Sequence, residues 1–159
     1  MDAWTISGTV ASFAGLGVGF WTLVTAQGAK EAAQQAARRA TLHDLTEELQ
    51  RAHQKMGEIG IFLMGKEWRA AYHAGNEVQS ACTSVSVRWS GTLTENALND
   101  LLTAGQLAQS IAKVAQILQI WPESPKKMRE KAGVTHLRAS GLISGVLAEA
   151  KQISEKDDV

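Results

Sequence analysis

Histidine and cysteine are the residues of this chain whose side chains most readily transfer protons, attack a substrate or bind a metal. The sequence has four histidines and one cysteine. No two histidines lie at i and i+4, and none follows a glutamate by three positions, so the helical zinc and di-iron motifs are missing. Cys82 falls on an apolar seam, where a small core residue is expected. We therefore expect no metal and no cofactor.

Two arginine–histidine pairs have a spacing that could serve RNA cleavage. Arg129 precedes His136 in REKAGVTH, and Arg38 precedes His43 in RRATLH. In such a site the histidine would act as general acid or base, and the arginine would stabilise the phosphorane. The second pair begins an apolar heptad seam near the N-terminal segment, so Arg129 and His136 are the candidate catalytic residues.

A basic cluster surrounds that candidate pair. It consists of Lys126, Lys127, Arg129 and Lys131. Such a cluster could bind RNA phosphates. A solvated helix face, or a face turned toward anionic lipid headgroups, would have the same composition.

The glycines near the N-terminus do not form a phosphate-binding loop. Gly15, Gly17 and Gly19 lack the G-x-G-x-x-G spacing, because position 20 is phenylalanine, and no strand pattern precedes them. A second near-match, GIFLMGKE at residues 60–67, places Glu67 where a P-loop needs a magnesium-binding serine or threonine. Nucleotide binding is therefore not expected at either segment.

The first 28 residues have the features of a transmembrane helix. No charged residue occurs between Ala3 and Gln27, which as a helix would extend about 37 Å and could cross a bilayer. Trp4 and Trp21 are spaced as two interfacial anchors would be. The cations that follow this segment predict an N-terminus outside and a cytoplasmic remainder, and the segment lacks the basic region of a cleavable signal peptide. A buried core helix is the alternative.

Small residues recur every fourth position within this segment. They form one stripe on a helix, made of Ser7, Ala11, Gly15 and Gly19. Stripes of this kind let helices approach closely and associate in lipid. The pattern predicts a homo-oligomer, although glycine is also common in membrane helices for other reasons.

The rest of the chain reads as all-α. The first helix should continue to about residue 64 on a heptad seam of Leu42, Leu45, Leu49, Ala52, Met56, Ile59 and Leu63. A second helix, residues 66–89, has a seam of Trp68, Ala71, Gly75, Val78, Cys82, Val85 and Trp89. A third follows a capping box at Thr92 and runs to about residue 121, with inward positions Leu98, Leu101, Ala104, Leu107, Ile111, Val114, Leu118 and Trp121.

A fourth helix is expected from a cap at Ser124 and Pro125 to about residue 153, with an interruption near Gly133. Gly141 and Gly145 suggest a close helix contact. Short connections predict antiparallel neighbours. The expected organisation is a transmembrane anchor at residues 1–28, a cytoplasmic antiparallel bundle of about four helices at 29–154, and an acidic tail at 155–159.

Charge and cysteine content limit the function classes further. Sixteen basic and sixteen acidic residues cancel, so no global field favours nucleic acid or an anionic membrane. A single cysteine excludes a disulfide within the chain and fits a reducing compartment.

The uncharged N-terminal helix, the alanine-rich neck AKEAAQQAARRA and the helical body with its arginine–histidine spacing together resemble one known group. These are the small single-span accessory proteins of bacterial RNA-targeting CRISPR systems, whose body is similar to HEPN ribonucleases. The resemblance is architectural and covers the whole chain loosely. It implies a helical subunit that assembles in the inner membrane and permeabilises it.

The resulting hypothesis is a membrane-anchored, self-associating bacterial defence effector without enzymatic activity. The expected partners are the lipid bilayer, further copies of the chain, and a cytoplasmic protein or RNA. A membrane-tethered scaffold and a membrane-tethered HEPN-like ribonuclease are the alternatives.

Overall fold

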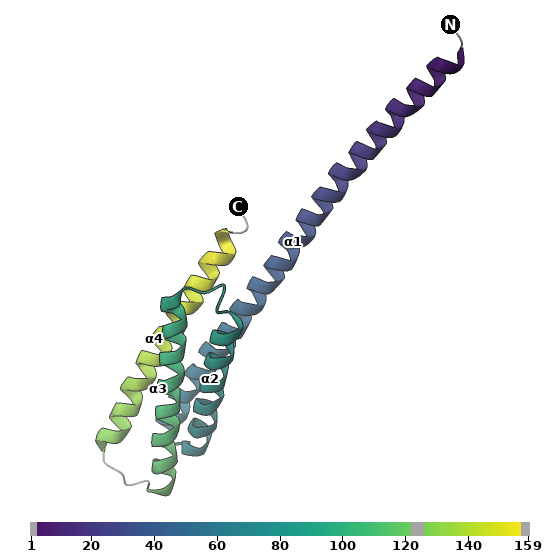
Figure 1. The fold of residues 1–159 in the computed structure, drawn as a ribbon. Helices are drawn as coiled ribbons and strands as arrows, with labels where there is room; N and C mark the ends of the chain where they lie inside the picture. Colours follow the sequence, from purple (N-terminus) through teal and green to yellow (C-terminus); the bar gives the residue numbers. More distant parts are fainter. Residues whose placement is uncertain (1–2, 122–125, 157–159) are drawn as a thin grey trace. The chain divides into compact units, whose positions relative to one another are not determined.

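The structure is a computed structural model that describes residues 3–121 and 126–156. Residues 3–28 and residue 31 are described by their backbone alone. The described part contains four helices and no strand, as shown in Figure 1: α1 (Ala3–Gly65), α2 (Trp68–Arg88), α3 (Glu95–Ile120) and α4 (Lys126–Lys156). The all-α prediction is therefore confirmed, and the four helices begin and end within a few residues of the expected positions.

The chain divides into two compact units at a point inside α1. The first unit comprises Met1–Ala40 and the second Thr41–Val159. In the second unit the last part of α1 joins α2, α3 and α4, and successive helices run in opposite directions (Figure 1). These four helical segments form an antiparallel bundle, as expected from the short connections, and the unit contains every contact discussed below.

No transmembrane helix is found in the described part of the chain. Over those residues, none of the helices combines the length and the apolar character needed to cross a bilayer. The predicted anchor at residues 1–28 lies outside the residues whose side chains are described. The same holds for Trp4 and Trp21 and for the stripe of Ser7, Ala11, Gly15 and Gly19. The anchor and the stripe stay predictions.

The core of the bundle begins with the heptad seam of α1. Six of its seven positions are buried, from Leu42 to Ile59, and Leu63 is half-buried. The seam of α2 is buried from Ala71 to Trp89, whereas its first predicted position, Trp68, is half-buried. The Trp89 indole donates from Nε1 to Glu48 Oε2 of α1 at 3.2 Å, and Arg88 also pairs with Glu48. A regular seam was therefore sufficient to predict the buried face of these two helices.

The buried face of α3 agrees with the prediction at Leu101, Ala104, Ile111 and Leu118 and differs from it elsewhere. Leu98, Leu107 and Val114 are only half-buried, and Trp121 is 70% exposed. Alanines take much of the interior instead, at positions 97, 108, 112 and 115. The physical reason is that α3 packs against both α2 and α4. A two-sided helix buries a broad face, and small residues there let the helix axes approach closely.

The predicted helix ends need two corrections. The N-cap of α3 is Thr94 and not Thr92, because the Thr94 side chain accepts a hydrogen bond from the Ala97 amide at 3.2 Å. Helix α4 continues through Gly133 without a break, and added Cβ atoms at Gly141 and Gly145 would meet nothing within 4 Å. The predicted close contact at these two glycines is therefore wrong within the described structure. The predicted cap at Ser124 and Pro125 lies outside the described residues.

Candidate functional site

The candidate catalytic pair lies on one face of α4, against the end of α1. Arg129 and His136 are seven residues apart, which is about two turns of an α-helix, so both side chains face the same direction. Together they border a hollow of about 360 Å³, which we call the α1–α4 groove. Its lining residues are Gly60, Leu63 and Met64 of α1 and Arg129, Gly133, His136 and Leu137 of α4.

His136 is held by the backbone of α1. Its Nε2 lies 2.8 Å from the carbonyl oxygen of Met56. Because a carbonyl oxygen can only accept, Nε2 is the nitrogen that carries the proton and donates it to this bond. Gly60 makes room for the contact, since a Cβ atom there would lie only 2.8 Å from His136 Cε1.

This contact changes the chemistry available to the candidate pair. A general acid needs a proton directed at the substrate, whereas the Nε2 proton of His136 is directed at Met56. Only Nδ1 is left as the ring nitrogen to accept a proton from a substrate. The geometry therefore fits a half-buried histidine that joins two helices better than it fits a general acid.

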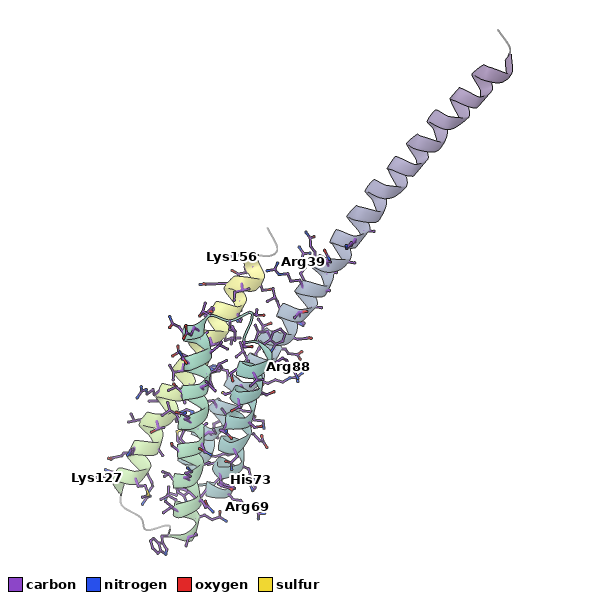
Figure 2. All side chains as sticks on the ribbon, viewed as in Figure 1. Arg39, Arg69, His73, Arg88, Lys127 and Lys156 are labelled. Carbon is purple, nitrogen blue, oxygen red and sulfur yellow. The ribbon has the colours of Figure 1, made fainter. Side chains whose placement is uncertain are left out.

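The basic cluster does not form a single patch. Lys126 pairs with Glu130 at 3.7 Å, and Lys127 is exposed at the start of α4 (Figure 2). Arg129 lines the α1–α4 groove, whereas Lys131 lines a different hollow between α3 and α4. The helix thus distributes the four cations of the predicted patch around its circumference.

The α1–α4 groove also has an apolar rim that the sequence analysis missed. Met64 is 80% exposed and Leu137 is 70% exposed, and both line the groove. Ile61 and Val134, each three residues before one of them on the same helix, are exposed as well. The sequence did contain a signal for this rim, because Ile61 and Met64 are apolar residues of α1 that fall outside its heptad seam. Exposure could not be derived without knowing that no other helix of the bundle packs there.

Cys82 is inert where it lies. Its side chain is buried between α2 and α3, and an added Cβ at Gly105 would lie 3.3 Å from its Cβ. Burial raises the pKa of the Cys82 thiol to about 11, which leaves little thiolate at neutral pH. The expectation of a core cysteine is confirmed. Among the described residues, no group of three or more histidine, cysteine and acidic side chains could hold a metal ion.

Comparison with known proteins gives no family for this chain. No known protein family, curated protein sequence or solved structure matches it at a significant level. The functional conclusions below therefore rest on the sequence and on the geometry of the bundle.

Proposed function

We propose that this chain is a membrane-anchored helical protein that self-associates through its N-terminal segment. One observation carries the proposal: α1 extends from Ala3 to Gly65 as one helix. The uncharged run that begins at Ala3 therefore belongs to the same helix as the buried seam of the bundle. An oligomer of the N-terminal segment would hold several bundles together at the inner membrane.

Close packing of the small-residue stripe is the proposed mechanism of association. Gly15 and Gly19 remove side chains where two copies of the helix would meet, so backbones can approach and dispersion contacts increase. Acting as a bacterial defence effector, such an oligomer would permeabilise the membrane. A membrane-tethered scaffold would use the same anchor and the same association without permeabilisation.

The stripe can be tested with two matched substitutions. Gly15→Leu places a bulky side chain on the stripe, whereas Gly17→Leu places the same side chain on the other side of the helix. The two substitutions raise the apolar character of the segment equally, so both variants should remain in the membrane fraction. Chemical cross-linking of membrane fractions should show oligomers for the wild type and for Gly17→Leu, and their loss for Gly15→Leu. Equal oligomers in all three, or a protein found only outside the membrane fraction, would contradict the proposal.

A ribonuclease is the second candidate function. The observation in its favour is that Arg129 and His136 border the same groove. RNA cleavage by the purified chain should then be lost in His136→Ala and kept in His73→Ala, whose histidine is exposed on α2. Circular dichroism of both variants would show whether the bundle is intact. Cleavage that survives His136→Ala in the folded protein, or no cleavage by the wild type, would eliminate this candidate.

A further inference from the structure

A hollow of about 330 Å³ lies between α3 and α4, which pack side by side (Figure 1). We call it the α3–α4 hollow. Five aliphatic side chains line it: Leu107, Ile111 and Val114 of α3, and Met128 and Ala132 of α4. Water in an apolar hollow finds few hydrogen-bond partners, so an apolar group that displaces this water lowers the free energy.

Lys131 is the one charged side chain among the described residues that line the α3–α4 hollow. No carboxylate of the described chain pairs with it, whereas Lys126 of the same helix pairs with Glu130 at 3.7 Å. An ammonium group binds a carboxylate through a charge-assisted hydrogen bond, which is stronger than a neutral one. The lining therefore combines an aliphatic surface with one cation that is available to a ligand.

Two hydroxyl groups complete the polar lining of the hollow. Ser110 donates to the Gln106 carbonyl at 2.9 Å, and Thr135 donates to the Lys131 carbonyl at 2.8 Å. Both protons are thus directed at the backbone of their own helix. The ammonium group of Lys131 is the donor that remains for a ligand.

The helix segments around the hollow contain no acidic residue. Residues 101–120 of α3 and 131–148 of α4 include Lys113, Lys131 and Arg138 but no aspartate or glutamate. A negatively charged ligand would therefore meet no like charge from these segments, and the summed field of the three cations would attract it. The α3–α4 hollow favours an anion over a cation.

The volume of the hollow limits the length and number of hydrocarbon chains. Pockets that hold small molecules usually measure about 300–1,000 Å³, so the α3–α4 hollow is near the lower limit. One acyl chain suits a space of this size, whereas the two chains of a bilayer lipid do not.

We propose that the α3–α4 hollow binds a fatty acid. Its hydrocarbon chain would lie among the aliphatic side chains of α3 and α4, and its carboxylate would bind the ammonium group of Lys131. The inference goes beyond the proposed membrane role and does not depend on it.

A photoreactive fatty acid tests the hollow directly. The probe is decanoic acid with a diazirine near the end of its chain, which inserts into neighbouring side chains on illumination. Two matched probes carry the same chain and diazirine, one with an alcohol and one with a trimethylammonium headgroup. The purified full chain is labelled in digitonin, a detergent whose rigid rings do not resemble an acyl chain. Mass spectrometry then locates the modified residues.

The headgroup should decide how strongly the wild-type chain is labelled. The acid should modify the peptides that contain Leu107, Val114 and Met128 about fivefold more than the alcohol does, and the trimethylammonium probe should modify them least. Lys131→Gln should remove the difference between the acid and the alcohol. Lys127→Gln, on the same helix but outside the lining, should keep it.

A second pair of variants locates the hydrocarbon chain. Ser110→Trp should fill the hollow and lower labelling by the acid about tenfold, because the chain has no other space between the two helices. Gln109→Trp adds the same side chain at the next residue, outside the lining, and should leave the labelling unchanged. Both positions are exposed, so circular dichroism should show the wild-type bundle in each variant.

Several outcomes would overturn the inference. One is that the acid and the trimethylammonium probe label these peptides equally, and another is that labelling is spread evenly over the four helices. Labelling that persists in Ser110→Trp would place the chain elsewhere. Equally strong labelling by a two-chain phosphatidylglycerol probe would make a bilayer lipid the ligand. The comparison of headgroups uses the wild-type chain alone, so it decides the matter even where a variant fails to fold.

Discussion

Gly60 and His136 form a specific contact between α1 and α4. The glycine leaves the Met56 carbonyl accessible, and the histidine ring fills that space and donates to the carbonyl at 2.8 Å. Glycine inside a helix normally costs about 1 kcal/mol relative to alanine. At Gly60 this cost is offset by the contact with His136, whose ring would have to move if a Cβ atom were present.

Two glycines of α1 should therefore respond differently to the same substitution. Gly57→Ala should raise the free energy of unfolding by about 1 kcal/mol, because an added Cβ meets nothing within 4 Å and helix propensity improves. Gly60→Ala should displace the His136 ring and leave the protein about 1–2 kcal/mol less stable than Gly57→Ala. Urea denaturation of the two variants measures this difference. Equal stability of the two variants would show that the His136 contact contributes nothing.

The buried thiol of Cys82 predicts a loss of stability at high pH. Its pKa is raised to about 11 in the folded chain, so the unfolded chain loses the thiol proton at a lower pH than the folded chain does. The contribution of this group is complete below about pH 9 and is lost as the pH rises through about 11. Urea denaturation from pH 8 to pH 11 should therefore show a smaller decrease in unfolding free energy for Cys82→Ala than for the wild type. Identical slopes would contradict the prediction.

Helices α2 and α3 pack closely at Gly75. A Cβ at Gly75 would lie 2.9 Å from the Ala108 carbonyl oxygen and 3.0 Å from the Ala112 Cβ. The atoms that it meets belong mainly to backbone, so they cannot rotate away as the His136 ring can. Alanine and glycine at these positions thus set the distance between the two helices.

Gly75→Ala should force α2 and α3 apart. We expect a loss of about 1–3 kcal/mol in unfolding free energy, because backbone atoms must move to admit one methyl group. Gly145→Ala on α4 is the matched control, since its added Cβ meets nothing within 4 Å, and it should stabilise the chain by about 1 kcal/mol. Thermal unfolding of both variants distinguishes the two cases. A Gly75→Ala variant as stable as the control would mean that the helices separate without cost.

In the proposed organisation of the whole molecule, helix α1 connects the N-terminal segment, through which copies associate, to the bundle. An effector that permeabilises the membrane and a tethered scaffold share this organisation, so only the state of the membrane separates them. Expression of the chain in bacteria should collapse the membrane potential, as read with a potential-sensitive dye. Gly15→Leu should prevent the collapse, and Gly17→Leu should not. An intact potential during expression of the wild type would favour the scaffold.

The sequence by itself determined the helical class, the approximate helix ends and the buried faces of α1 and α2. Each of those faces is one regular seam, and helical periodicity alone defines which side of such a helix is apolar. The face of α3 was determined only in part: the predicted positions Leu101, Ala104, Ile111 and Leu118 are buried, but so are alanines outside the predicted seam. They are buried because α3 has two neighbouring helices, and periodicity does not report a second neighbour.

Only the tertiary structure brought Met56, Gly60 and His136 together. His136 lies 80 positions after Met56 along the chain, and the contact depends on how α1 packs against α4. The sequence contains the spacing of Arg129 and His136. It does not show that the Nε2 proton of His136 is directed at the backbone carbonyl of Met56. It also contained Met64 and Leu137 without showing that the packing of the four helices leaves both exposed on one groove.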